Sequence, residues 1–174
     1  MKVFGLAGWS GSGKTTLMTR LLPALLARGV SVSTVKHAHH AFDVDQPGKD
    51  SYRHREAGAT EVMISSERRW ALMHELRGDA EPPLAELLGH MSPVDLVIVE
   101  GFKHAAVPKI EVYRAVVGKK LLATEDSDIV AVASDLPVAG LGALPRFALD
   151  DVGEIADFII AHLHIAVQDR GAAQ

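Results

Sequence analysis

The chain has 174 residues, no cysteine and a formal net charge of −4, and 48% of its residues are hydrophobic. This length and composition are typical of one folded domain, exclude disulfide bonds and thiolate metal sites, and give no electrostatic reason to expect a nucleic-acid partner. Because no apolar run is long enough to span a bilayer, we expect a cytoplasmic protein that has no membrane partner.

The first part of the chain has the pattern of a strand–loop–helix–strand unit. A short apolar run, residues 3–7, predicts a buried strand, and leucines recur at helical spacing over residues 14–28, up to Gly29. Pro23 lies inside this helical run and lacks a backbone N–H, so we expect a kink or a brief break there. A second strand is predicted over residues 30–35, which gives the unit from which parallel sheets are built.

The middle of the chain departs from this alternation of strands and helices. Residues 36–59 form a polar stretch that becomes helical near Lys49, and a polar stretch of this length in a compact domain is usually functional or mobile. Residues 61–65 and 69–76 predict two strands around a tight turn, which makes a hairpin and not a crossover. A short helix is predicted over residues 82–91.

The remaining sequence predicts three strands and a last helix. Residues 95–101 give the strongest strand pattern, because their central residues are apolar without alternation, as in a sheet that is covered on both faces. Residues 109–114 alternate in polarity and predict an edge strand, and residues 129–134 predict another buried strand. The last helix is expected over residues 152–163, and a capping box would begin it, with Asp151 as its first member.

The loop between the first strand and the first helix carries the most specific motif. Residues 8–15 fit the pattern G-x-x-x-x-G-K-[ST], whose glycines let backbone N–H groups approach the oxygens of a polyphosphate. The following helix adds unpaired N–H groups and its positive dipole end. Lys14 can reach the β- and γ-phosphates, Thr15 can offer a hydroxyl to Mg²⁺, and Thr16 can bond near the α-phosphate. The alternative is a glycine-rich turn that only caps a helix.

Together these patterns predict an α/β fold of the P-loop NTPase type. We expect three layers, with helices on both faces of a mostly parallel central sheet and an inserted β-hairpin. A single nucleotide-binding domain is expected over residues 1–164, followed by a frayed tail over residues 165–174.

Two acidic residues follow predicted buried strands. Such a site needs a carboxylate that holds Mg²⁺ through water; Glu100 fits, and Gly101 could present its N–H to a γ-phosphate. The alternative is a glutamate that only begins a surface loop. Asp135 could accept hydrogen bonds from guanine N1–H and N2–H₂, whereas the lone pair of adenine N1 would repel it. Asp135 is equally well interpreted as a turn aspartate before Pro137.

A dense polar cluster follows the second strand. Its members are Lys36, His37, His39, His40, Asp43 and Asp45. Three interpretations stay open: a segment that senses the γ-phosphate and Mg²⁺ through Asp43 or Asp45, a separate zinc site, and a solvated loop with incidental histidines. Four basic residues, Lys49, Arg53, Arg55 and Lys103, could hold a second phosphorylated ligand or simply form a charged solvated surface.

Five segments, in their order and spacing, resemble the molybdopterin-guanine dinucleotide biosynthesis protein B (MobB) family. They are "GWSGSGKTTL", "VKHAHHAFDVDQPGKDSYRHREAGA", "RWALMHEL", "DLVIVEGFKH" and "DIVAVASD", and the likeness covers about residues 3–163. Countless proteins share the first segment, whereas the second segment and "VEGFK" are far more particular.

The resemblance implies a P-loop protein that binds GTP and Mg²⁺, hydrolyses GTP weakly and often forms a homodimer. It also implies an accessory role beside a partner, a molybdopterin guanylyltransferase that attaches GMP to the molybdenum-bearing pterin. The residues that it implies for the phosphates are Ser10, Gly11, Ser12, Gly13, Lys14, Thr15 and Thr16.

The remaining implied site residues lie outside this loop. Thr15 and Glu100 would serve Mg²⁺, and Asp45 would lie near the nucleotide or the metal. Ser134 and Asp135 would face the base. We expect Lys14 and Asp45 to take part in catalysis. Where the usual guanine-reading pattern is N-K-x-D, this chain has "ASD", so the resemblance supports phosphate binding more directly than guanine selection.

The leading hypothesis is therefore a GTP-binding accessory protein with slow GTPase activity. A small-molecule kinase is the alternative, for which Arg68 and Arg69 in the hairpin turn are the obvious lid residues. A nucleotide switch that releases a partner on hydrolysis is a third possibility. We expect a homodimer built partly through residues 61–76, because the edge of the hairpin could extend a neighbour's sheet.

Overall fold

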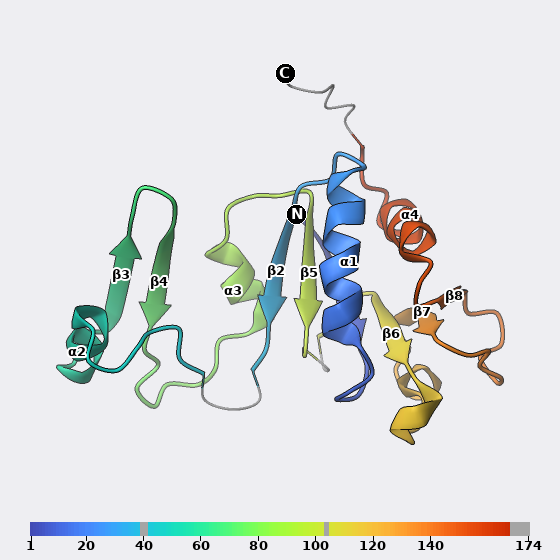
Figure 1. Ribbon diagram of the computed structural model, residues 1–174, viewed down its shortest axis with the longest axis horizontal. Helices are drawn as coiled ribbons and strands as arrows, with labels where there is room; N and C mark the ends of the chain where they lie inside the picture. The colour runs from blue at the N-terminus through green and yellow to red at the C-terminus, as the bar shows by residue number, and fades with distance from the viewer. Residues whose placement is uncertain (39–41, 103–104, 168–174) are drawn as a thin grey trace. The chain divides into compact units, whose positions relative to one another are not determined.

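The structure is a computed structural model, and it describes residues 1–38, 42–102 and 105–167 (Figure 1). The chain forms two compact units, which are described separately below. The first unit contains Met1–His37 and Ser92–Gln174, and the second contains Ala38–Met91. Within the described residues, no helix is long and apolar enough to cross a membrane.

The first unit is built on a parallel sheet of six strands in the order β2-β5-β1-β6-β7-β8. The strands are β1 (Lys2–Ala7), β2 (Val32–Lys36), β5 (Leu96–Glu100), β6 (Lys109–Tyr113), β7 (Ile129–Ser134) and β8 (Arg146–Ala148). Because every described pair in this sheet is parallel, the carboxyl ends of all six strands lie at one edge. Loops at that edge are where open α/β sheets bind their ligands.

Helices α1 (Lys14–Leu26) and α4 (Val152–His162) pack against each other and against one face of this sheet. Leucines at helical spacing on α1, among them Leu21 and Leu25, are fully buried, as are Ile155 and Ile159 of α4. They meet alternate residues of the strands, such as Phe4, in one continuous core. The predicted α/β fold with a mostly parallel sheet and flanking helices is therefore confirmed.

The second unit contains α2 (Asp50–Glu56), β3 (Glu61–Ser65), β4 (Trp70–His74) and α3 (Leu84–Gly89). Strands β3 and β4 pair in antiparallel fashion, which confirms the predicted hairpin. Val62 and Met73 face each other across the hairpin and are buried, and α2 packs against β3. The expectation of one domain over residues 1–164 remains a prediction.

The expectation that residues 109–114 form an edge strand is wrong. Strand β6 lies between β1 and β7, and its alternating polar residues are buried. Lys109 forms an ion pair with Asp126, with 3.0 Å between Nζ and Oδ2, and the carboxylate of Glu111 accepts two backbone hydrogen bonds. These polar residues can be buried because their partners are distant in the sequence. The alternation of polar and apolar residues in β6 therefore does not mark a solvent-exposed face.

Two local predictions about the helices are also corrected. Helix α1 continues through Pro23 to Leu26 without a break, because the burial of Leu21 and Leu25 on either side offsets the single lost hydrogen bond. Helix α4 begins after Asp151 as predicted, but the Asp151 side chain makes no capping hydrogen bond. Instead, the backbone N–H of Val152 donates to the carbonyl of Asp150.

Candidate functional site

The glycine loop joins the carboxyl end of β1 to the first turn of α1. The backbone φ angles of Gly8, Gly11 and Gly13 are +138°, +81° and +99°, which residues with a side chain rarely adopt. A Cβ atom on Gly8 would lie 2.5 Å from the carbonyl oxygen of Val112, so only glycine fits there. Gly13 is the N-cap of α1 and contributes no side chain to cap it, so the first N–H groups of the helix keep their hydrogen-bonding capacity for a ligand.

The polar side chains of the loop lie close to its backbone. Lys14 Nζ donates hydrogen bonds to the carbonyl oxygens of Gly8, at 2.8 Å, and of Trp9, at 3.0 Å, which holds the ammonium group against the start of the loop. Ser12 is only 2% exposed, and its Oγ is a buried polar atom that has no hydrogen-bond partner among the described residues. A buried hydroxyl of this kind is a group that a ligand oxygen could satisfy.

Glu100 ends β5 at the same edge of the sheet as the loop. In the strand register Glu100 lies beside Leu6 of β1 and beside Lys36 of β2. Gly101 has a φ of +90°, and a Cβ there would lie 2.9 Å from the carbonyl oxygen of His37, so the two loops approach closely. The hydroxyl of Thr15 and the carboxylate of Glu100 are hard oxygen donors, so the residues present at this edge fit Mg²⁺.

The zinc interpretation of the histidine cluster gains no support. No group of three or more His, Cys, Asp and Glu side chains that could hold a metal ion is found in the part of the chain that the structure describes. His39 and His40 lie outside the described residues, as does Lys103, so the predictions made for them are not tested.

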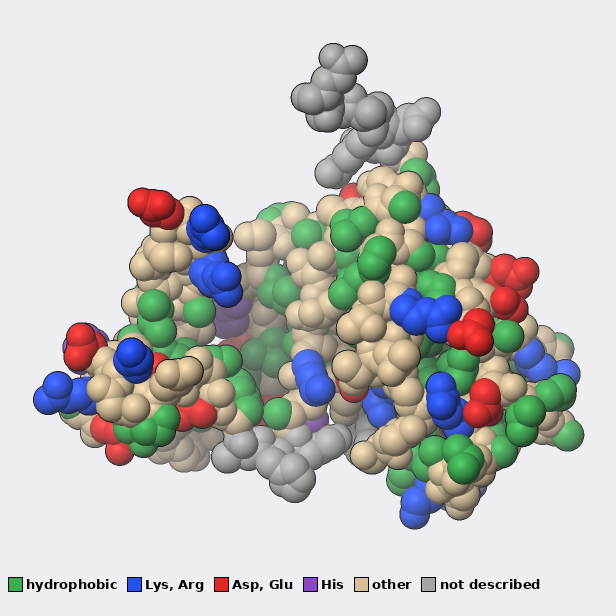
Figure 2. Space-filling view, viewed as in Figure 1, with side chains coloured by type: hydrophobic (Ala, Val, Ile, Leu, Met, Phe, Trp, Pro, Cys, Tyr) green, Lys and Arg blue, Asp and Glu red, His purple; other side chains and the backbone are tan. Residues whose placement is uncertain are grey.

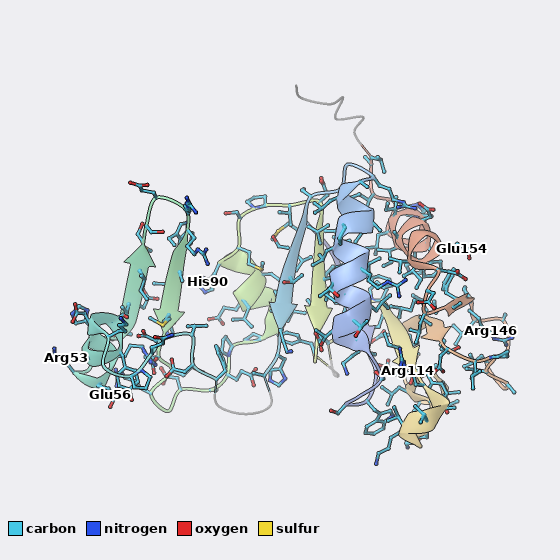
Figure 3. The ribbon with its side chains drawn as sticks, viewed as in Figure 1. Arg53, Glu56, His90, Arg114, Arg146 and Glu154 are labelled. Carbon is cyan, nitrogen blue, oxygen red and sulfur yellow. The ribbon has the colours of Figure 1, made fainter. Side chains whose placement is uncertain are left out.

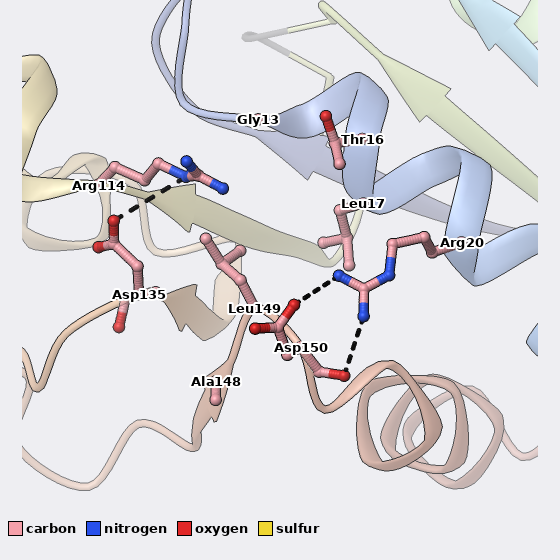
Figure 4. A pocket seen from close by; sticks show the side chains of 10 residues that line it. Gly13, Thr16, Leu17, Arg20, Arg114, Asp135, Ala148, Leu149 and Asp150 are labelled. Atoms are coloured by element: carbon pink, nitrogen blue, oxygen red, sulfur yellow. Dashed lines mark hydrogen bonds and ion pairs between the residues drawn. The ribbon is translucent and has the colours of Figure 1, made fainter.

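An open pocket of about 130 Å³ lies beside the first turns of α1 (Figure 4). The residues that line it are Gly13, Thr16, Leu17, Arg20, Arg114, Ser134, Asp135, Ala148, Leu149 and Asp150. The structure thus brings Ser134 and Asp135, predicted to face a base, into one pocket with Gly13 and Thr16, predicted to hold phosphates. Residues from α1 and from the ends of β6, β7 and β8 build this pocket together.

Four charged side chains line the pocket, in two pairs of opposite sign. Asp135 is partly exposed, and its Oδ2 lies 4.0 Å from Nε of Arg114. Arg20 forms a 2.7 Å ion pair with Asp150, from its Nη1 to Oδ1. Sequence reasoning missed Arg114 and Arg20. For Arg114 a signal existed, because it directly follows a predicted strand, but residues 109–114 were expected to form an edge strand.

Asp45 belongs to the second unit, so the structure does not place it relative to the glycine loop. Its side chain is 5% exposed and is held locally. Its Oδ1 accepts hydrogen bonds from Ser51 Oγ at 2.8 Å and from the Gln46 backbone N–H at 2.9 Å, and its Oδ2 lies 3.5 Å from Arg55 Nε. The proposed role of Asp45 near nucleotide or metal therefore stays a prediction.

The Arg55 guanidinium is surrounded by carboxylates of the second unit. It pairs with Asp43 at 2.8 Å and with Glu75 at 2.9 Å, in addition to its approach to Asp45. A hydrogen bond from the backbone N–H of Asp45, together with the Arg55 guanidinium, lowers the pKa of Asp43 below its usual value. These contacts stabilise the fold of the second unit, so the interpretation of Arg55 as a ligand for a second phosphorylated molecule loses support.

Comparison with known proteins agrees with this architecture. The family model described as molybdopterin guanine dinucleotide synthesis protein B matches residues 3–135. The molybdopterin-guanine dinucleotide biosynthesis adapter protein of Escherichia coli K12 is 45% identical over 159 residues, which are 88% of this chain and 89% of that protein. The adapter protein of Haemophilus influenzae is 41% identical over 167 residues, which are 93% of this chain and 89% of that protein.

Solved structures show the same relationship. A crystal structure of molybdopterin-guanine biosynthesis protein B superposes with a TM-score of 0.71 at 32% sequence identity, covering 92% of this chain and 99% of that chain. The crystal structure of Bacillus subtilis MobB has a TM-score of 0.72 at 23% identity, covering 94% of this chain and 98% of that chain, and at that identity it supports the fold alone. The chain belongs to the molybdopterin guanine dinucleotide synthesis protein B family.

Proposed function

We propose that this protein is an adapter in molybdopterin-guanine dinucleotide biosynthesis that binds GTP with Mg²⁺, hydrolyses it slowly and assists a partner nucleotidyltransferase in the cytoplasm. The adapter role is supported by relatives at 45% and 41% identity that carry this name. The observation that carries nucleotide binding is the pocket in which the start of α1 and the residues after β7 meet. One ligand with a phosphate tail and a base would contact both.

In this proposal each part of the site has a separate task. The N–H groups at the start of α1 bind the phosphate oxygens, and Lys14 moves from the carbonyls of Gly8 and Trp9 to the β- and γ-phosphates. Mg²⁺ would neutralise phosphate charge and would be held by Thr15 and, through water, by Glu100. Asp135 accepts hydrogen bonds from guanine N1–H and N2–H₂.

Base selection is the sharpest test of this proposal. The affinities of the wild type for GTP and ATP are measured by titration calorimetry with Mg²⁺, beside those of Asp135→Asn. An asparagine offers one acceptor and one donor where guanine needs two acceptors, so we expect the preference for GTP to fall by about tenfold or more. Asp150→Asn is the matched control, because Asp150 lines the same pocket but is paired with Arg20. Equal affinities of the wild type for GTP and ATP would refute guanine reading.

The alternative of a small-molecule kinase has no observation in its favour. Arg68 and Arg69, the residues expected to form its lid, belong to the turn of the hairpin in the second unit. They therefore give no evidence of a lid over the phosphates. Release of free phosphate from GTP, with none transferred to a small acceptor, is the result that the adapter proposal expects.

The hairpin supports the proposal of a homodimer. It forms a two-stranded sheet of its own, and isolated two-stranded sheets are marginally stable in water. Met63 and Leu72 are paired on one face of the hairpin, beside Trp70, and they are 61%, 43% and 62% exposed, respectively. Figure 2 shows hydrophobic side chains on the hairpin surface below the charged side chains of its turn. A second copy of this chain would extend the sheet and cover these residues.

The dimer is tested by sedimentation at protein concentrations on the order of tens of micromolar, at which modest interfaces associate. We expect a dimer for the wild type and a monomer for Trp70→Glu, because a buried charge at this face would oppose association. A Val116→Glu variant is the control, since Val116 is 86% exposed in the first unit. A monomeric wild type would overturn the dimer proposal and would leave nucleotide binding unaffected.

A further inference from the structure

The positively charged guanidinium of Arg114 lies directly beside the glycine loop. It follows the last residue of β6, Tyr113, which pairs with Ser134 in the strand register. A Cβ atom on Gly13 would lie 3.5 Å from Nε and 3.6 Å from Nη2 of Arg114, so the guanidinium lies in contact distance of the N-cap of α1. Figure 3 shows Arg114 at the edge of the sheet where α1 begins, and Figure 4 shows its side chain between Gly13 and Asp135.

The surroundings of this guanidinium are unfavourable for a cation by itself. The start of a helix carries a partial positive charge, so a cation placed there is repelled by the helix dipole. Lys14 adds a second cation at the same turn. Asp135 is a distant counter-charge at 4.0 Å, and Nε of Arg114 is buried without a hydrogen-bond partner among the described residues. An anion bound at the start of α1 would attract the guanidinium of Arg114, the ammonium of Lys14 and the positive end of the helix dipole, and so would offset their mutual repulsion.

The position of Arg114 indicates which part of a nucleotide it would contact. The ammonium of Lys14 lies over the first residues of the loop, Gly8 and Trp9. Arg114 lies at the other end of the loop, over Gly13 and toward Asp135. A nucleotide with its base at Asp135 and its terminal phosphates at Lys14 would bring its α-phosphate to the guanidinium.

We propose that Arg114 binds the α-phosphate of the guanine nucleotide, an assignment that rests on the nucleotide site proposed above. A guanidinium presents two parallel N–H donors to a phosphate, and such charge-assisted hydrogen bonds are about twice as strong as neutral ones. Because the α-phosphate is common to GTP, GDP and GMP, Arg114 holds all three equally. Lys14, by contrast, favours the nucleotides that carry β- and γ-phosphates.

Buried contacts in the first unit fix the segment that carries Arg114. The fully buried carboxylate of Glu111 accepts hydrogen bonds from the backbone N–H groups of Leu122, at 2.9 Å, and of Ala123, at 2.8 Å. Trp9 Nε1, in the glycine loop, donates to the carbonyl of Lys120 at 2.8 Å. The segment after β6 is thus tied to both the sheet and the loop, which keeps the guanidinium beside Gly13 before any nucleotide binds.

The test compares Arg114→Gln with the wild type on four ligands. GTP, GDP, GMP and guanosine compete, in the presence of Mg²⁺, with a fluorescent GDP analogue. We expect the affinities for GTP, GDP and GMP to fall by a common factor of about tenfold, from the loss of charge-assisted hydrogen bonds, and the affinity for guanosine to change by less than about twofold. Arg146→Gln is the matched control, since Arg146 is an exposed arginine of the same unit that does not line the pocket, and we expect no common loss.

Each other outcome overturns the assignment. A loss confined to GTP would place Arg114 at the γ-phosphate, and an equal loss for guanosine would place it at the base or in the fold. Unchanged affinities would show that Arg114 does not contact the nucleotide. A wild type that binds no guanine nucleotide would refute the proposed function itself, which separates the two failures. If Arg114→Gln does not fold, Arg114→Lys keeps the positive charge, and a smaller common loss is expected.

Discussion

The most direct test of the loop geometry is the substitution Gly8→Ala. A Cβ atom at this position would lie 2.5 Å from the carbonyl oxygen of Val112, on β6, and 2.8 Å from Ser12 Oγ. Because the first of these atoms is backbone in the middle of the sheet, it cannot move away as a flexible side chain would. The φ angle of +138° adds conformational strain for any residue with a side chain.

We expect Gly8→Ala to lower the free energy of unfolding by about 3 kcal/mol, of which about 1–2 kcal/mol is backbone strain and the rest is steric overlap. Gly11→Ala is the matched control: its φ is +81°, but nothing lies within 4 Å of the added methyl group, so about 1 kcal/mol is expected. Both variants are unfolded in urea in a Trp70→Phe background, where tryptophan fluorescence comes from Trp9 alone. A difference between the two variants below about 0.5 kcal/mol would contradict the close approach of Gly8 to β6.

Two further predictions concern charged side chains. Lys14→Ala should abolish measurable GTP binding in calorimetry. The free energy of unfolding should change by about 1 kcal/mol or less, since only two partly buried hydrogen bonds are lost. Unaltered GTP affinity would contradict the role of Lys14. Glu111 is fully buried, and burial raises the pKa of its carboxyl group above the usual 4.5. The backbone hydrogen bonds from Leu122 and Ala123 lower this pKa, but the effect of burial is larger. The folded state therefore favours the protonated carboxyl, so the stability of the wild type relative to Glu111→Gln is greatest below about pH 4.5 and falls as the pH rises through the raised pKa. Urea unfolding of both proteins from acidic to neutral pH measures this, and a difference independent of pH would exclude the ionisation of a buried Glu111.

The sequence predicted the elements whose pattern is local. The apolar runs of β5 and β7 and the leucine spacing of α1 each report burial directly, so these elements were identified with nearly correct bounds. The glycine loop was found for the same reason, because the pattern G-x-x-x-x-G-K-[ST] consists of consecutive residues. Each of these features depends on neighbours within one element and not on the tertiary arrangement.

Strand β6 was misplaced because its polar residues take partners from distant segments. An alternating pattern normally marks one buried and one solvated face. Here Lys109 reaches Asp126 and Glu111 reaches Leu122, and both polar side chains are almost completely buried. No local pattern reveals such partners, so the position of β6 in the sheet could not be predicted, and the place of Arg114 beside the glycine loop depended on it. Strand β8 was missed for a simpler reason, since three residues give no periodicity.

The order of strands sets the orientation of the proposed nucleotide, with its metal-bound phosphates toward β5 and its base toward β7. Strand β1, which leads into the glycine loop, has β5 on one side and β6 and then β7 on the other. Glu100 ends β5, whereas Arg114 and Asp135 follow β6 and β7, so the acid expected at the metal lies on one side of the loop, and the residues proposed for the α-phosphate and the base lie on the other. The sheet topology would therefore separate the proposed metal site from the proposed base site. Substitutions of Glu100 should alter the dependence of GTP binding on Mg²⁺, and substitutions of Asp135 should alter the preference for guanine, each without the other.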